Sequence, residues 1–274
     1  MVEAPRIVII YQNILFAKNK KIINASGASY RKIGIDLVGY IIKKLWFVGK
    51  YIFIYLTKNK SSYVIRTHLM MYGRIVINNS IVNSKLCPFL RLELDDNNTL
   101  TWYLSQIKIF NPRCKTDIIK SNFQSCSSYQ TIKDSIAMMK YDITNKHFDF
   151  ESMIKHLIVG LDKNNNDIIV DFLLDQKYFP GVGNILQQEA LYKCRINPTK
   201  LVSNINIDFL KCLVSALRET TADLYLLYTS SGSNNSNTIL QIYHKKYCPL
   251  GHKTITKKLG FRNRRTTWCP ICQT

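Results

Sequence analysis

Four side chains that commonly bind metals lie in two short pairs near the C-terminus. Cys248 and His252 form a C-x3-H pair, and Cys269 and Cys272 form a C-x2-C pair after sixteen intervening residues. Thiolate and imidazole ligands in two tight turns, a β-hairpin apart, are typical of tetrahedral structural zinc. We therefore expect one structural Zn2+ on these four residues. His244 stays open as a competing fourth ligand, because C-x3-H is less usual than C-x2-C.

The segment around these ligands is strongly basic. A hairpin held by a metal is rigid without a large core, so it can hold an arginine at a fixed height over a phosphate. A solvated basic face is the alternative, and the number of cations beside the metal-binding turns favours phosphate binding. The cations are Lys245, Lys246, Lys253, Lys257, Lys258, Arg262, Arg264 and Arg265.

A glycine-rich turn lies between two expected helices in the second half of the chain. The first helix ends near Gln176, the turn carries Pro180, Gly181 and Gly183, and Asn184 begins the next helix. Backbone N–H groups at a helix N-terminus can bind phosphate, and glycine permits close backbone approach. By itself the G-x-G spacing is also compatible with an ordinary helix connection.

Taken together, these segments resemble the Fpg/Nei family of DNA glycosylases. The stretch L-L-D-Q-x-x-x-P-G-V-G-N-I-x-x-x-E-A-L is similar to the helix–two-turns–helix motif of that family. The tail L-Q-I-Y-H-K-K-Y-C, followed by R-x-T-x-W-C-P-I-C-Q, is similar to its zinc finger. The resemblance follows the order of the modules along nearly the whole chain. It implies base excision repair, in which oxidised bases are removed and the strand is nicked at the abasic site.

The resemblance also implies an N-terminal nucleophile. Family members use a mature N-terminal proline, whereas Val2 occupies that position here, as in the third vertebrate Nei-like type. Once Met1 is removed, a primary amine would attack the sugar C1′, expel the base and leave a Schiff base. An α-amine has a pKa of about 7.7–8, so part of it is neutral near pH 7. Glu3 matches the general acid/base of the family.

Other positions match family residues that assist elimination or contact DNA. Lys50 matches a lysine of the β domain, and Arg264 matches the zinc-finger arginine that grips phosphate and assists δ-elimination. His68 and Asn184 match phosphate contacts, and Met71 stands where a methionine fills the gap left by the flipped base. The complete set of expected DNA contacts is His68, Met71, Arg113, Lys177, Gly183, Asn184 and Tyr243.

Two departures from the family pattern bear on the substrate. The motif D-P-R-R-F reads Asn111-Pro112-Arg113-Cys114-Lys115 here, so Lys115 replaces an aromatic wedge. A cation does not stack between bases as an aromatic ring does, which predicts tolerance of or preference for single-stranded DNA. The loop Ser230–Asn237 is short, which predicts that 8-oxoguanine is a poor substrate. Oxidised pyrimidines and hydantoins are the expected lesions.

The elements that must position these residues form an α+β multidomain chain. Alternating apolar residues in several short strands predict a sandwich or a barrel, and we expect an N-terminal β-sandwich over residues 1–125, with residues 126–148 as the linker. A helix–two-turns–helix domain is expected over 149–230 and a zinc finger over 240–274. The expected strands are Lys50–Leu56, Tyr63–His68, Gly73–Ile77, Phe89–Leu94 and Leu100–Ile109, with a hairpin turn at Asp95–Asn98. The expected helices are Ile33–Lys44, Tyr129–Met139, Phe150–Val159, Asp167–Leu174, Ile185–Cys194 and Ile207–Leu227, the fourth capped by Asn166-Asp167.

Composition restricts the class of partner. The chain has 274 residues, and 38 basic against 18 acidic side chains give a net charge of +20. That excess attracts nucleic acid. No apolar run approaches a membrane span and no signal pattern is present, so we expect an intracellular monomer that acts at DNA, in the nucleus or, for a viral or prokaryotic source, the cytoplasm. Five cysteines are read as ordinary small apolar side chains: Cys87, Cys114, Cys126, Cys194 and Cys212.

Two other functions stay open at this point. A non-catalytic protein that binds damaged DNA could use the same scaffold, and the missing proline at position 2 is its support. A ribosomal or RNA-binding zinc protein would explain the charge and the metal ligands. It would not explain the segment from Leu173 to Ile185.

Overall fold

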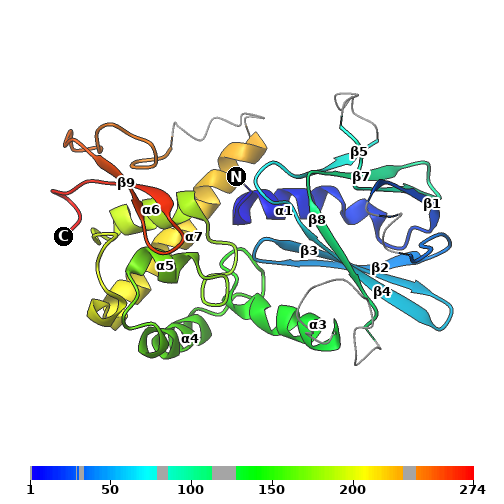
Figure 1. Ribbon diagram of the computed structural model, residues 1–274, viewed down its shortest axis with the longest axis horizontal. Coiled ribbons are helices and arrows are strands. Elements are labelled where there is room, and N and C mark those ends of the chain that lie inside the picture. Colours follow the sequence, from blue (N-terminus) through cyan, green and yellow to red (C-terminus); the bar gives the residue numbers. More distant parts are fainter. Residues whose placement is uncertain (1, 29, 31–33, 79–85, 113–127, 231–238) are drawn as a thin grey trace. The chain divides into compact units, whose positions relative to one another are not determined.

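The computed structural model describes residues 2–28, 30, 34–78, 86–112, 128–230 and 239–274 (Figure 1). The chain divides into two compact units. The first contains Met1–Val2 and Ile7–Ala137, and the second contains Glu3–Arg6 and Met138–Thr274.

The first unit is built on two four-stranded antiparallel sheets (Figure 1). One sheet has the strand order β1-β6-β7-β5 and the other has the order β2-β3-β4-β8. The strands are β1 (Ile22–Ser26), β2 (Ile41–Val48), β3 (Tyr51–Lys58), β4 (Ser61–His68), β5 (Arg74–Ile77), β6 (Leu90–Leu94), β7 (Thr99–Tyr103) and β8 (Gln106–Phe110). Its described helices are α1 (Ala4–Asn13), which belongs to this unit from Ile7 onward, the 3₁₀ turn η1 (Leu15–Ala17) and α3 (Ser128–Ala137).

Alternating apolar side chains of both sheets form one core. On β6, Leu90, Leu92 and Leu94 are buried while the residues between them are partly exposed, as the period of two requires. Trp102 on β7 is fully buried, and its Nε1 donates to Thr67 Oγ1 on β4 at 3.0 Å. This bond links the two sheets across the core. The predicted N-terminal β-sandwich is confirmed.

Helix α1 lies in a stretch where the sequence predicts no helix. Ile7 is fully buried, and the Tyr11 ring packs 5.0 Å from the Phe47 ring on β2. Pro5 falls in the first turn, where a missing N–H removes no helical hydrogen bond. Because the β-branched run Ile7–Ile10 favours a strand locally, packing against the sheets decides for the helix.

The helix predicted around Ile33–Lys44 is wrong wherever the structure describes that stretch. Strand β2 begins at Ile41 and pairs with β3, and its register shifts between Ile42 and Lys44. The shift is a β-bulge, which leaves both Lys43 and Lys44 exposed. The bulge interrupts the alternation of apolar and polar residues, so the period could not be read from the sequence.

The single strand predicted over Leu100–Ile109 is two strands. Strand β7 belongs to one sheet and β8 to the other, and the chain changes sheets at Leu104 and Ser105. Leu104 has a left-handed backbone with φ of 49°. A leucine gives no sequence signal for such a turn, because bulky residues rarely adopt it.

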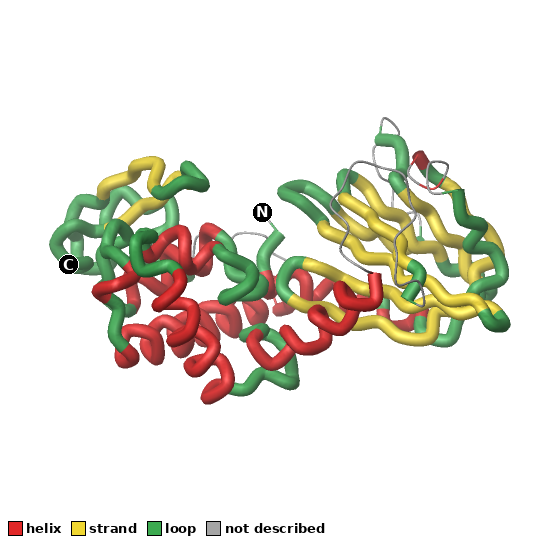
Figure 2. Tube along the Cα trace, turned by 60° about the horizontal axis from the view of Figure 1, so that its bottom comes forward, coloured by secondary structure: helices red, strands yellow, loops and turns green. Residues whose placement is uncertain are grey.

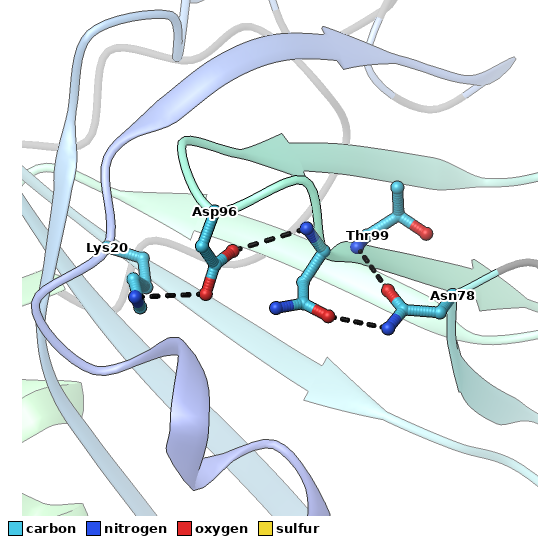
Figure 3. A network of polar contacts seen from close by, with 5 residues as sticks. Lys20, Asn78, Asp96 and Thr99 are labelled. Carbon is cyan, nitrogen blue, oxygen red and sulfur yellow. Dashed lines mark hydrogen bonds and ion pairs between the residues drawn. The ribbon is translucent and has the colours of Figure 1, made fainter.

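The hairpin turn predicted at Asp95–Asn98 is confirmed by the antiparallel pairing of β6 with β7. A polar network fixes this turn (Figure 3). Asp96 Oδ2 pairs with Lys20 Nζ at 3.0 Å, and Asp96 Oδ1 accepts the Asn98 N–H at 3.2 Å. Asn78 donates to Asn98 Oδ1 and accepts the N–H of Thr99 at 2.9 Å. The network joins the β6–β7 turn to Lys20, which precedes β1, and to Asn78, which follows β5.

The second unit is helical and ends in a β-hairpin, in red and yellow respectively in Figure 2. Its buried apolar residues form a separate core that includes Met153, Phe172, Leu186 and Leu217. Its helices are η2 (Met138–Tyr141), α4 (Phe150–Lys163), α5 (Ile169–Leu174), α6 (Asn184–Lys193), η3 (Val202–Asn204) and α7 (Ile207–Ser230). Its strands are β9 (Ile255–Leu259) and β10 (Arg264–Trp268), which pair antiparallel.

The predicted cap of α5 is wrong. Its N-cap is Ile168, which makes no side-chain hydrogen bond to the helix. The Ile169 N–H donates instead to the Lys200 carbonyl at 2.8 Å, so a distant segment supplies the acceptor. The first turn of α4, by contrast, is capped by Asp149, whose side chain accepts the Ser152 N–H at 2.7 Å.

Two of the five scattered cysteines are not ordinary apolar side chains. Cys194, at the end of α6, and Cys212, on α7, form a disulfide. Cys87 is a free exposed cysteine, and Cys114 and Cys126 lie outside the described residues. Nothing in the local sequence distinguishes the bonded pair, because 18 positions separate them.

None of the helices that the structure describes is both long enough and apolar enough to cross a membrane.

Candidate active site and metal centre

The glycine-rich turn between α5 and α6 is built by Asp175 and Gln176. Asp175 Oδ1 accepts the Lys177 N–H at 2.9 Å, which closes a tight turn after α5. Gln176 Nε2 donates to the Val182 carbonyl at 2.9 Å, and its Oε1 accepts the Gly181 N–H at 3.1 Å. One amide side chain therefore ties both edges of the loop together and fixes where α6 begins.

Glu3 lies at the N-terminus of α6. Its carboxylate accepts the Ile185 N–H at 3.0 Å and the Leu186 N–H at 3.2 Å, and Glu3 is only 4% exposed. The Ala4 N–H donates to the Gly181 carbonyl at 3.1 Å, which anchors the adjoining backbone. Free N–H groups and the helix dipole favour a negative charge at this end of a helix. The carboxylate is thus held in one place next to Val2.

Gly183 leaves room for this carboxylate. A Cβ at position 183 would lie 2.3 Å from Glu3 Oε1, far inside van der Waals contact. The backbone of Gly183 is extended, with φ of −128°, so the residue is required by close approach and not by a left-handed conformation. The sequence predicted close approach at this glycine, but to a phosphate.

Asn184 and Tyr243 complete the surroundings of Glu3. Burial raises the pKa of Tyr243 and the nearby Glu3 charge raises it further, while the hydrogen bond with Asn184 and the charge of Arg265 oppose the rise. Asn184 is buried, and its Nδ2 donates to the Arg265 carbonyl at 2.9 Å. The amide for which the sequence predicts a phosphate contact is therefore bonded to strand β10 in the structure.

Two side chains of α6 that were not singled out from the sequence attach the C-terminal segment. Glu189 accepts the N–H groups of Gln241, Ile242 and Tyr243 at 2.8–3.0 Å. Gln188 Nε2 donates to the Arg265 carbonyl at 3.1 Å, and its Oε1 accepts the Thr267 N–H at 2.7 Å. The available sequence signal was a polar run, Gln187–Glu189, inside a helix that is buried nearly all round.

Val2 has a buried side chain. It is 8% exposed and belongs to the apolar core of the first unit, together with residues such as Ile7 and Leu45. From the sequence, only the backbone amine of Val2 was predicted to have a role. Its side chain also fixes the position of the backbone directly before Glu3.

Lys50 and His68 lie close together in the first unit. Lys50 is in the turn between β2 and β3, and Tyr51, the next residue, pairs with His68 on β4. The Tyr51 and His68 rings are 5.0 Å apart. Burial lowers the pKa of His68, and the charges of Lys50 and Arg66 lower it further. This end of the sheet therefore concentrates positive potential without a charged histidine.

The other expected DNA contacts lie on different elements of the two units. Met71 is 49% exposed in the turn after β4, beside the exposed Met70 and Tyr72. Lys177 lies in the turn after α5, with its Nζ 5.4 Å from the centre of the Tyr178 ring. Arg264 is exposed on β10, opposite Leu259. Arg113, as well as Lys115 and the loop Ser230–Asn237, fall wholly or largely outside the described residues.

The structure brings the four predicted metal ligands together. One ligand atom from each of Cys248, His252, Cys269 and Cys272 lies within 4.8 Å of the others. Cys248 Sγ is 3.7 Å from His252 Nδ1 and 3.9 Å from Cys272 Sγ. A tetrahedron with metal–ligand bonds of about 2.0–2.3 Å has edges of about 3.3–3.8 Å, which these distances approach. His252 belongs to the cluster and His244 does not.

The environment of Cys248 favours a thiolate. Burial raises the pKa of its thiol, but the N–H groups of His252 and Leu250 and the Tyr192 hydroxyl donate to the sulfur and bring the pKa down to about 6. Tyr192 is itself buried, which raises its pKa and keeps its hydroxyl a donor. Metal-binding cysteines act as thiolates, so these donors suit a ligand.

Comparisons with known proteins agree with this architecture. The family model described as the formamidopyrimidine-DNA glycosylase H2TH domain matches residues 141–223. The chain is 50% identical over 275 residues to Endonuclease 8-like L720 of Acanthamoeba polyphaga mimivirus, covering 100% of both chains. With this likeness and the fold above, the chain belongs to the Fpg/Nei family of DNA glycosylases, enzymes of base excision repair. The predicted resemblance is confirmed.

Other relatives and solved structures match the chain over most of its length. A solved viral DNA glycosylase has a TM-score of 0.91 and 49% identity, with both chains covered over 100%. Endonuclease 8-like 3 of Mus musculus is 27% identical over 241 residues, which are 86% of this chain and 35% of that protein. Fpg of Lactococcus lactis, solved with DNA that contains an oxidised pyrimidine, shares the fold with a TM-score of 0.75 at 19% identity.

Proposed function

We propose that this chain is a bifunctional DNA glycosylase/AP lyase in which the amine of Val2 is the nucleophile and Glu3 transfers protons. The observation that carries the proposal is the fixed Glu3 carboxylate, held by the Ile185 and Leu186 N–H groups directly after Val2. A general acid/base must lie within reach of the atoms that it protonates, and a buried, doubly hydrogen-bonded side chain keeps its position.

The reaction proceeds by displacement at the sugar. After removal of Met1, the neutral Val2 amine attacks C1′, the N-glycosidic bond breaks, and the damaged base leaves with the electron pair of that bond and a proton. Glu3 moves a proton to the ring oxygen as the sugar opens, and a Schiff base between Val2 and C1′ results. Loss of a C2′ proton then expels the 3′ phosphate, which is β-elimination.

Positive side chains assist the later steps in this proposal. Lys50 would contact phosphate beside His68, whose lowered pKa keeps its imidazole neutral and able to donate one hydrogen bond. Arg264, exposed on β10, would hold a phosphate and assist δ-elimination. Met71 would fill the space left by the flipped base, since its side chain is exposed and apolar.

We also propose one structural Zn2+ on Cys248, His252, Cys269 and Cys272. Three thiolates and one imidazole are a common ligand set for structural zinc, and the separations between their ligand atoms suit a tetrahedron. Four protein ligands leave no open position, so the ion would stabilise the hairpin and supply no reactive water.

The substrates proposed are oxidised pyrimidines and hydantoins, in single-stranded DNA as well as duplex. Lys115 in place of an aromatic wedge supports the tolerance of single strands. We propose that the protein acts inside the cell as a monomer. The preference for single-stranded or duplex DNA is tested together with the chemistry.

Borohydride trapping tests the lyase directly. The purified protein is incubated with a labelled oligonucleotide carrying a hydantoin, single-stranded and duplex in parallel, and N-terminal mass spectrometry records whether Met1 is removed. We expect a covalent adduct on both substrates. A matched control inserts one glycine before Val2, which keeps a primary amine but moves it by about 3.5 Å, so the adduct should be lost.

The same experiment distinguishes a DNA glycosylase/AP lyase from a non-catalytic protein that binds damaged DNA. An adduct that forms equally well with the displaced amine would contradict the role of Val2. No adduct from protein that lacks Met1, contains its metal and still binds DNA would favour a non-catalytic protein that recognises damage.

A further inference from the structure

The β9–β10 hairpin is attached to the helices at two places, one on each side of Arg264. At the tip, Asp171 of α5 accepts the Phe261 N–H with Oδ2 at 3.0 Å and the Arg262 N–H with Oδ1 at 3.4 Å. Further along β10, Asn184 and Gln188 of α6 bind the Arg265 carbonyl. The backbone that carries Arg264 is therefore fixed before and after this residue.

The contact at the tip requires both partners. Asp171 is only 4% exposed, so its carboxylate has lost most of its hydration and is compensated by the two N–H groups. Gly260 has φ of +68°, and a Cβ there would lie 2.1 Å from Asp171 Oδ2. The turn Gly260–Asn263 thus seats its backbone on the carboxylate, and the Asn263 N–H closes the turn on the Gly260 carbonyl at 3.1 Å.

A negative charge is an unexpected choice at this place. The turn and β10 carry Arg262, Arg264 and Arg265, whose charges attract a polyanion. The buried carboxylate of Asp171 at the same turn opposes the approach of phosphate. A neutral side chain could also accept a hydrogen bond from the backbone. The carboxylate is the stronger acceptor, because hydrogen bonds to charged groups are roughly twice as strong as neutral ones.

We propose that Asp171 is a positioning residue for the DNA-binding arginine of the hairpin. It does not touch DNA; it holds the turn so that Arg264 stays at a fixed height for one phosphate. The inference rests on the proposed phosphate contact of Arg264 and extends it to a residue on a different element.

The direction in which DNA affinity changes when the charge of Asp171 is removed tests this role. Removing a negative charge from a DNA-binding protein ordinarily tightens binding. We expect Asp171→Asn to weaken binding to DNA with a tetrahydrofuran abasic analogue by about fivefold to tenfold, because one phosphate contact is lost. Asp162→Asn is the matched control: Asp162 is exposed on α4, and its loss should leave affinity unchanged or higher.

The salt dependence of binding distinguishes positioning from general damage to the fold. Loss of one phosphate contact lowers the slope of log K against log salt by about 0.9 for duplex DNA. Both Arg264→Ala and Asp171→Asn should show this decrease, and the double variant should resemble Arg264→Ala alone. Gly260→Ala attacks the same contact from the hairpin side and should reproduce the effect. Metal content and the melting temperature are recorded for every variant.

The outcomes are distinct. Unchanged or tighter binding by Asp171→Asn, an unchanged salt slope, or full additivity with Arg264→Ala would each overturn the inference. So would an Arg264→Ala variant that binds like the wild type, since Asp171 would then have no contact to position. Failure of the wild type to form a borohydride adduct would instead refute the proposed lyase, while its binding to the abasic analogue leaves the test of Asp171 valid.

Discussion

The absent side chain of Gly183 creates the space that the Glu3 carboxylate fills. Two N–H groups of α6 hold that carboxylate, and a Cβ at position 183 would overlap it. The two residues are 180 positions apart, so their contact could not be read from the sequence. A glycine with an extended backbone is easily taken for a flexible hinge, yet here its role is to be small.

We expect Gly183→Ala to lower the single-turnover rate of base excision by at least about tenfold, which corresponds to about 1.4 kcal/mol in the barrier. The added methyl group would displace Glu3 while the core of the second unit stays intact. Gly34→Ala is the control: that glycine has a left-handed φ of +67° and nothing within 4 Å. The control should lose some stability but keep its excision rate, and normal excision by Gly183→Ala would contradict this role.

The lowered pKa of His68 predicts in which direction the stability of the protein changes with pH. Burial, Lys50 and Arg66 lower its pKa in the folded protein, whereas the unfolded chain has the ordinary value of about 6.5. As pH falls through about 6.5, the unfolded state gains a proton before the folded state does, so the free energy of unfolding decreases. Thermal melts should show this loss, and His68→Gln should reduce it. An NMR titration that gives His68 a pKa above about 6.5 would refute the assignment.

At the scale of elements, the sequence predicted those helices and strands whose apolar period is regular. The pattern located α4, α7 and most strands, because one face of each is buried, and it also located α6, which is buried nearly all round. It failed where tertiary contacts override local preference: at α1 with its β-branched run, at the bulge of Lys43 and Lys44, and at Leu104. The ligands of the metal cluster could be found, since spacing alone restricts them. Sequence reasoning could not find the roles of Asp171, Gln188 and Glu189, because their hydrogen-bond partners lie far away in the sequence.

The metal centre should behave as a separable element. We expect Cys269→Ser to lose the metal and DNA binding, because Cys269 is fully buried in the cluster and the hairpin has few apolar residues of its own. The helical core around Phe172 and Leu186 should persist, as measured by circular dichroism alongside metal analysis. Cys87→Ser, at an exposed free cysteine, should change neither property. Retention of stoichiometric metal by Cys269→Ser would contradict the ligand assignment.

At the scale of the whole molecule, the net charge of +20 sets the strength of non-specific binding to DNA. If about six phosphates are neutralised, the dissociation constant should rise by about 10³-fold between about 50 and about 200 mM salt. The slope should be similar for undamaged and damaged duplexes, because phosphate contacts carry no information about the base. A nearly flat dependence in a fluorescence-anisotropy titration would mean that most of the excess charge faces away from the nucleic acid.

The disulfide between Cys194 and Cys212 acts on the denatured state of the chain. It closes a loop across 18 positions, and Ile196 in that loop accepts a hydrogen bond from Gln273, the neighbour of the last metal ligand. A cross-link of this length restricts the denatured ensemble and stabilises the fold by about 3 kcal/mol. A reducing solvent would return that conformational freedom to the denatured chain while the native contacts stay the same. Two preparations with identical folds could therefore differ in how readily the end of the chain that carries the metal ligands is released.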